Sequence, residues 1–181
     1  MPDWFDKSVG SGDNMFYSWE AGYAHFISID SESAVDTAYV NDIEFRFIQK
    51  DLSTVDRKKT PWLIAHMHRP AYCSDDHACL NNGKPYGNAE YLRKRLEDTL
   101  VQYGVNLVLQ GHVHSYERSY PVYNQTVTSK SYEHATTPTY ILQGSSGNRE
   151  VYHIMWRDVM HAMTSHCCHV FFCILYLLSL I

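Results

Sequence analysis

The sequence has no strongly basic segment and no apolar segment of membrane-spanning length. Its net charge is −5 over 181 residues, and no run of Lys and Arg is longer than three residues, as in Arg57-Lys58-Lys59. A nucleic-acid-binding surface normally carries a basic patch, so the sequence does not support this class of partner. The most apolar stretch, Val170 to Ile181, would reach about 18 Å as a helix against a hydrocarbon layer of about 30 Å, so we expect no membrane span.

The first residues also lack the features of a secretory signal, which are a basic segment followed by an apolar one. We therefore expect no signal peptide in this chain. Cysteine is scarce and odd in number: Cys73 and Cys79 share one loop, and the other three are Cys167, Cys168 and Cys173. The loop pair would form a disulfide in an oxidising compartment and remain free thiols otherwise, and the sequence leaves both open.

The composition present, with 45% hydrophobic and 19% charged residues, is that of a globular domain. Apolar spacing of three and four predicts two helices, and short apolar runs predict strands between them. The first helix would bury Val40, Ile43, Phe47, Ile48, Leu52 and Val55; the second would bury Tyr91, Leu92, Leu96, Leu100 and Tyr103 and end at Gly104. The predicted strands are 23–29, 62–66, 105–109 and 139–143. Alternating strands and helices predict a largely parallel sheet, with the functional site in the loops at its carboxyl edge.

Histidines follow two of these predicted strands. His112 and His114 come after the strand at 105–109, and His68 comes after the strand at 62–66. Imidazole is a good ligand for first-row metals, and the end of a strand gives it a rigid support. The sequence therefore predicts a metal site at this edge, with His66 in the core or in a supporting position.

Several segments together resemble the purple acid phosphatases of the calcineurin-like metallophosphoesterase superfamily. They are Gly111-His112-Val113-His114-Ser115-Tyr116-Glu117-Arg118, the run from Trp62 to Pro70 with Ala71-Tyr72-Cys73-Ser74, and the segments 14–19, 25–30 and 120–126. The resemblance covers residues 14 to 149. It implies an α/β fold, a metallophosphoesterase-like β-sandwich of two mixed sheets flanked by helices, with a dinuclear metal centre at strand ends.

The resemblance also implies roles for particular residues. His114 would bind a ferric ion, and His68 and His112 would bind a second, divalent metal, which is zinc, iron or manganese. His77 would contact the substrate phosphate or protonate the leaving group, and Tyr116 and Arg118 would support the site. The implied reaction is acid phosphatase activity, the metal-dependent hydrolysis of phosphate monoesters, in a secreted or extracellular glycoprotein with Asn124 in the sequon Asn124-Gln125-Thr126.

The family's upstream ligand motifs, which contain Asp-x-Gly, Gly-Asp-x-x-Tyr and Gly-Asn-His, do not occur in the sequence. We therefore expect residues 1–150 to be the C-terminal part of the catalytic domain, with its N-terminal portion missing and its activity impaired, followed by an atypical hydrophobic tail at 151–181. The alternative is a non-catalytic scaffold or fragment that binds a partner or at most one metal, and a third possibility is a fragment that does not fold. Physiological substrate and oligomeric state are not encoded in any pattern we can identify.

Overall fold

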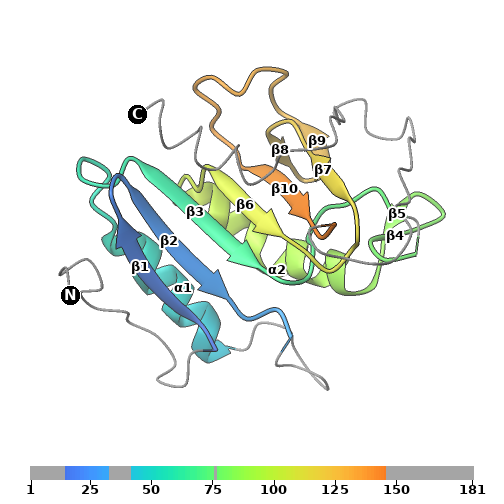
Figure 1. The fold of residues 1–181 in the computed structure, drawn as a ribbon, viewed down its shortest axis with the longest axis horizontal. Coiled ribbons are helices and arrows are strands. Elements are labelled where there is room, and N and C mark those ends of the chain that lie inside the picture. The colour runs from blue at the N-terminus through green and yellow to red at the C-terminus, as the bar shows by residue number, and fades with distance from the viewer. Residues whose placement is uncertain (1–14, 33–41, 76, 146–181) are drawn as a thin grey trace.

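The computed structural model describes residues 15–32, 42–75 and 77–145. Within these ranges the chain forms a six-stranded mixed sheet, shown in Figure 1. Its strands in chain order are β1 (Tyr17–Ala21), β2 (Ala24–Ile29), β3 (Trp62–Met67), β6 (Leu107–Gln110), β7 (Tyr116–Arg118) and β10 (Thr139–Gln143). Two separate hairpins pair β4 (Leu80–Asn81) with β5 (Lys84–Pro85), and β8 (Val122–Tyr123) with β9 (Thr126–Val127).

The strands lie in the spatial order β1-β2-β3-β6-β10-β7. Strands β2, β3, β6 and β10 pair in parallel, whereas β1 and β7 pair antiparallel at the two edges. The predicted largely parallel sheet is thus confirmed, and within the described residues it is accompanied by two short hairpins rather than by the second large sheet of the predicted sandwich. Because parallel strands end at the same edge, the loops after β2, β3 and β6 meet there.

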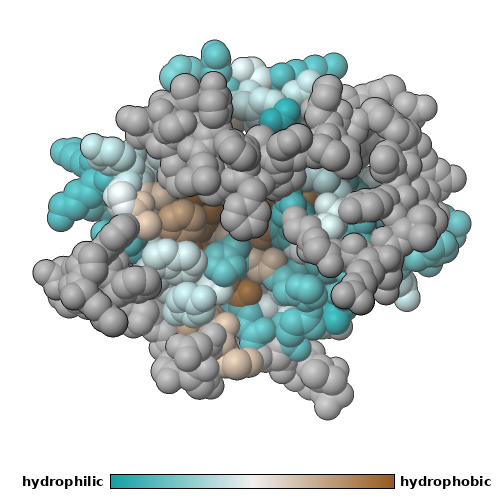
Figure 2. All heavy atoms as spheres, viewed as in Figure 1, coloured by the Kyte–Doolittle hydropathy of each residue, from teal (hydrophilic) through white to brown (hydrophobic). Residues whose placement is uncertain are grey.

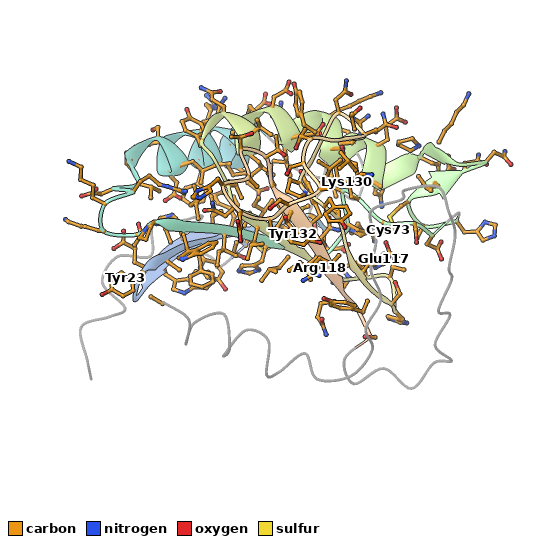
Figure 3. All side chains as sticks on the ribbon, turned by 90° about the horizontal axis from the view of Figure 1, so that it is seen from above. Tyr23, Cys73, Glu117, Arg118, Lys130 and Tyr132 are labelled. Atoms are coloured by element: carbon orange, nitrogen blue, oxygen red, sulfur yellow. A yellow bond between two sulfur atoms is a disulfide. The ribbon has the colours of Figure 1, made fainter. Side chains whose placement is uncertain are left out.

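Both helices, α1 (Asp42–Thr54) and α2 (Gly87–Gln102), lie on one face of the sheet, as the view from above in Figure 3 shows. The main core fills the space between the helices and the sheet. Its fully buried members include Ile27, Ile48, Leu63, Leu92, Leu96, Leu100 and Val108. Burying each such side chain contributes about 1.5–3 kcal/mol, so this layer accounts for most of the stabilisation of the described fold.

Helix α2 follows its sequence prediction closely. Leu92, Leu96 and Leu100 are buried, and Tyr91 and Tyr103 pack against the same core. The helix ends before Gly104, whose φ of 67° lies in the left-handed region that glycine adopts without strain. The backbone N–H of Val105 then bonds the carbonyl of Leu100 at 2.9 Å and leads the chain into β6.

Helix α1 differs from its prediction at Ile43, and Val40, which was also expected on its buried face, lies outside the described residues. Ile43 was expected on the buried face, but it is 69% exposed, and the adjacent Glu44 is only 2% exposed. The helix is rotated so that Glu44, Ile48 and Leu52 face the sheet, and the Glu44 carboxylate accepts a hydrogen bond from the backbone N–H of Asp30 at 2.7 Å. That backbone bond compensates for burying a polar group, which apolar periodicity alone could not anticipate.

The opposite face of the sheet carries half-buried apolar side chains, which Figure 2 shows as brown areas between grey and teal ones. Trp19 stacks on Phe26 at 5.0 Å between ring centroids and meets the ring of His66 edge-on at 5.4 Å. Burial lowers the pKa of His66, which fits the expected core position. No helix in the described ranges is long and apolar enough to cross a membrane; the predicted tail at 151–181 lies outside them.

Candidate metal centre

Glu32, His68 and His112 converge at the carboxyl edge of the sheet. They follow β2, β3 and β6 within three residues of each strand's end, and these three strands are parallel neighbours. One ligand atom from each side chain lies within 4.8 Å of the other two. We call these three residues the edge cluster. Two of its members, His68 and His112, were predicted from the sequence, and Glu32 was not.

The spacing of the edge cluster fits a shared metal ion. His68 Nε2 lies 3.1 Å from His112 Nδ1 and 3.6 Å from Glu32 Oε1. Two ligands that each lie about 2.1 Å from one ion are about 3.0–3.4 Å apart at octahedral or tetrahedral angles. The ring nitrogens already have this separation, and the carboxylate oxygen is a few tenths of an ångström beyond it. Two imidazoles and a carboxylate suit zinc, iron and manganese.

The backbone between β6 and β7 forms a tight turn that presents His112. His112 has a φ of 68°, which is uncommon for a residue with a side chain and costs about 1–3 kcal/mol. The turn is fixed by a bond from Gly111 N–H to the carbonyl of His68 at 2.9 Å and by one from Val113 N–H to the carbonyl of Gly111 at 2.8 Å. The first bond joins the two histidine loops directly, so His68 and His112 are held relative to each other by backbone.

Glu32 is held by a different set of bonds. Its N–H bonds the Asp30 carboxylate at 2.9 Å, and the Asp30 N–H bonds Glu44 at 2.7 Å. From the other side, the N–H of Arg69 bonds the Ser31 hydroxyl at 2.8 Å. The loop after β2 is therefore tied both to α1 and to the loop that carries His68.

The buried carboxyl of Glu44 makes stability depend on pH. Burial is the main cause that raises its pKa to about 8, with the Asp30 charge adding to the rise and the Asp30 N–H opposing it. In the folded protein the group stays protonated while the unfolded chain ionises near 4.5, so folding stability should fall as pH rises from about 4.5 to about 8. Glu44→Gln cannot ionise and should lack this decline, which makes it more stable above pH 8 by on the order of 2 kcal/mol.

Urea unfolding midpoints of wild type and Glu44→Gln at both ends of this pH range measure the effect. Glu133→Gln, which changes an exposed loop carboxyl, is the matched control. Equal pH dependence in wild type and Glu44→Gln would show that Glu44 ionises normally in the folded chain.

Arg69 lies beside the edge cluster and contacts two of its members. Its Nε donates to Glu32 Oε2 at 3.0 Å, and its Nη1 lies 3.4 Å from His112 Nε2. Partial burial, followed by the charges of Arg69 and His68, lowers the pKa of His112. His112 is therefore neutral over a wider pH range, and a neutral ring is the form that binds metals.

His114 and His77 lie outside the edge cluster. His114 is exposed two residues after His112, near enough that its charge contributes to the lowered pKa of His112. His77 is exposed in the loop between β3 and β4, where its N–H bonds the Asp75 carboxylate at 2.8 Å. The ferric-ligand role of His114 and the catalytic role of His77 remain predictions.

The His77 loop is closed by a disulfide between Cys73 and Cys79, which resolves the alternative that the sequence left open. Ser74 in this loop donates its N–H and its hydroxyl to Glu117, at 2.8 and 2.9 Å. Figure 3 shows Cys73 and Glu117 close together at one end of the sheet. These two hydrogen bonds join the disulfide loop to the segment after His114. Burial raises the pKa of the Glu117 carboxyl.

The remaining predicted positions lie on β7 and on the β8–β9 hairpin. Tyr116 and Arg118 are half-buried on edge strand β7, and the Arg118 guanidinium stacks over Tyr132 at 4.7 Å (Figure 3). Asn124 is exposed in the turn of the hairpin, with a φ of 45°. Their supporting and glycosylation roles remain predictions.

A mixed sheet that gathers two histidines and a carboxylate at its carboxyl edge defines an α/β protein with a possible metal site at that edge. The Calcineurin-like phosphoesterase family model matches residues 8–116, and the chain belongs to this family. The family implies a dinuclear metal centre, and the edge cluster is a possible part of it.

Comparison with known proteins confirms the resemblance to purple acid phosphatases. Purple acid phosphatase 15 of Arabidopsis thaliana is 37% identical over 146 residues, which are 81% of this chain and 24% of that protein. Acid phosphatase type 7 of Homo sapiens is 35% identical over 153 residues, covering 78% of this chain and 35% of that protein. The purple acid phosphatase PPD1 from yellow lupin superposes with a TM-score of 0.61 at 26% identity, over 78% of this chain and 24% of that one. The chain thus spans between a quarter and about a third of these relatives.

Proposed function

We propose that this chain contributes part of the active site of an acid phosphatase that hydrolyses phosphate monoesters. The observation that carries the proposal is the approach of His68 Nε2 and His112 Nδ1 to 3.1 Å at the ends of two parallel strands. The names of its relatives support the same reaction class, since they are acid phosphatases. The complete reaction belongs to the whole protein.

In this proposal, His68 and His112 hold the divalent metal, which is zinc, iron or manganese, and His114 binds a ferric ion beside it. When bound, the two ions would lower the pKa of a bound water and stabilise the negative charge of the phosphoryl group. The chain's own groups position the ligands: the Gly111 to His68 backbone bond sets the two rings, and Arg69 beside His112 helps to keep that ring neutral. His77 would contact the phosphate or protonate the leaving alcohol from the disulfide loop.

A secreted location is part of the proposal. The Cys73–Cys79 disulfide is of a kind that persists in oxidising compartments, and the exposed Asn124 sequon would accept a glycan there. Neither feature depends on the metal site, so location can be tested separately by following the glycan in a secreting host.

Metal content and hydrolysis together test the proposed function. Purified chain is loaded with iron and zinc, separated from free metal by gel filtration, and assayed for bound metal by mass spectrometry and for hydrolysis of p-nitrophenyl phosphate. We expect bound metal, and any hydrolysis, to be lost in His112→Ala and retained in His134→Asn, which changes an exposed loop histidine whose φ of 53° asparagine tolerates.

The outcomes separate the two candidate functions. Hydrolysis that disappears with His112→Ala establishes the phosphatase for this chain itself. Bound metal without hydrolysis favours the non-catalytic alternative, which the edge cluster also accommodates because it could hold a single ion. Wild type that binds no metal at all would contradict the proposed function and leave the alternative of a scaffold that binds a partner.

A further inference from the structure

We propose that Glu32 is the carboxylate ligand of the divalent metal, so that Glu32, His68 and His112 form a three-ligand site built by this chain alone. The inference rests on the part of the proposed function that assigns His68 and His112 to that metal. It adds a ligand that lies in a polar loop with no metal-binding motif around it.

The hydrogen bonding of Glu32 is the first observation. Its Oε1 is shielded from solvent, although the side chain as a whole is 43% exposed. Arg69 Nε lies 2.9 Å from Oε1 and 3.0 Å from Oε2, and its single N–H makes its hydrogen bond to Oε2. Oε1 is therefore paired with Arg69 by charge but receives no hydrogen bond in the described part of the chain. A shielded carboxylate oxygen of this kind would be stabilised further by a metal cation.

The direction of that oxygen is the second observation. Oε1 lies 3.6 Å from His68 Nε2, whereas Oε2 accepts the hydrogen bond of Arg69 Nε. The carboxylate therefore presents Oε1 to the histidines while Arg69, which lies within 3.0 Å of both oxygens, holds its orientation. A ligating carboxylate is commonly oriented in this way by a hydrogen bond to its other oxygen.

The third observation is that the Glu32 backbone is fixed before any ion binds. Asp30 and Glu44 hold the loop from one side, and the Ser31 hydroxyl joins it to Arg69 N–H on the other. A preformed loop loses little conformational entropy when the ion arrives, which favours affinity.

The competing explanation is that Glu32 serves only as the ion-pair partner of Arg69. The two explanations differ in what removal of Arg69 does. If Glu32 only pairs with Arg69, then Glu32→Gln and Arg69→Met should affect metal binding alike. If Glu32 is a ligand, Glu32→Gln should weaken binding and change the cobalt bands, whereas Arg69→Met, which keeps the carboxylate, should leave the bands of bound cobalt like those of wild type.

Titration of the metal-free chain with Co²⁺, followed by calorimetry and by the visible ligand-field absorption of cobalt, tests the inference. We expect a tight site in wild type, affinity lowered at least about tenfold in Glu32→Gln, and altered cobalt bands where binding persists. Glu133→Gln should match wild type, and circular dichroism verifies that each variant is folded.

The possible results distinguish failure of the Glu32 inference from failure of the histidine metal site. If Glu32→Gln binds cobalt like wild type while His112→Ala does not, the Glu32 inference is overturned and the histidine site stands. Equal weakening in Glu32→Gln and Arg69→Met, with the cobalt bands of both variants like those of wild type, overturns it as well, in favour of the ion pair. Failure of wild type to bind cobalt instead overturns the metal site on which both proposals depend.

Discussion

Gly144→Ala should abolish metal binding by the edge cluster while leaving both helices folded. A Cβ atom at this position would overlap the backbone carbonyl of Val113, which lies between His112 and His114. The N–H of Gly144 also bonds the carbonyl of Ser115 at 3.1 Å, so the end of β10 is packed directly on the histidine turn. Backbone cannot rotate away as a flexible side chain can, so the turn must shift and carry His112 out of register with His68.

Cobalt titration of Gly144→Ala measures the expected loss of metal binding, and far-ultraviolet circular dichroism measures whether the helices remain folded. Gly22→Ala is the matched control: its Cβ would meet no atom within 4 Å, and its φ of 57° costs about 1 kcal/mol when alanine replaces glycine. Gly22 lies in the turn between β1 and β2, at the opposite end of β2 from the edge cluster. Cobalt affinity that is unchanged in Gly144→Ala would show that the turn relaxes without moving His112.

The sequence predicted the sheet and its helices because their stabilisation comes from local periodic patterns. Strand β10 was predicted with its observed bounds, and α2 ends two residues before Gly104, where its end was predicted. Edge strands β1 and β7 and the hairpins β4–β5 and β8–β9 were not predicted. In β7 and the hairpin strands, two or three residues are too few to show an alternating pattern. For α1, the prediction assumed that the buried face of the helix is wholly apolar, and the buried Glu44 contradicts this assumption.

In the candidate site, too, some residues were predicted from the sequence and others were missed. His68 and His112 were predicted because each directly follows an apolar strand and carries a recognisable motif. Glu32 also follows a strand, β2, by three residues, and that position was the available signal. It was missed because a glutamate in a loop is usually solvated, and only the parallel pairing of β2 with β3 brings it to His68. Glu117 was likewise visible in the motif, but its bonds to Ser74 depend on how a loop 43 residues away folds back.

Glu97→Ala should lower the free energy of unfolding by about 3–5 kcal/mol, the largest stability effect we expect from a polar substitution in this chain. Glu97 is 4% exposed and accepts hydrogen bonds from the Tyr72 hydroxyl at 2.5 Å and the Asn124 N–H at 3.0 Å, and it pairs with Arg93 at 3.4 Å. Alanine would leave Tyr72 and Arg93 buried without their acceptor and would remove the acceptor of the Asn124 N–H. The Tyr72 hydroxyl in turn accepts the Gln125 N–H at 2.9 Å, so the β8–β9 turn would lose one hydrogen bond directly and the Tyr72 hydroxyl that makes another would no longer be held by Glu97.

Thermal unfolding should show the loss as a midpoint lowered by roughly 6–20 °C, and hydrogen exchange should show early opening of the β8–β9 turn. Glu97→Gln separates the two contributions, because its amide oxygen still accepts from Tyr72 while the charge that Arg93 pairs with is gone. We expect this variant to fall between wild type and Glu97→Ala. Glu90→Ala, which removes an exposed ion pair with Lys94 on the same helix, should unfold like wild type. If Glu97→Ala and Glu90→Ala proved equally mild, the turn that carries the Asn124 sequon would have to be held by contacts other than this buried carboxylate.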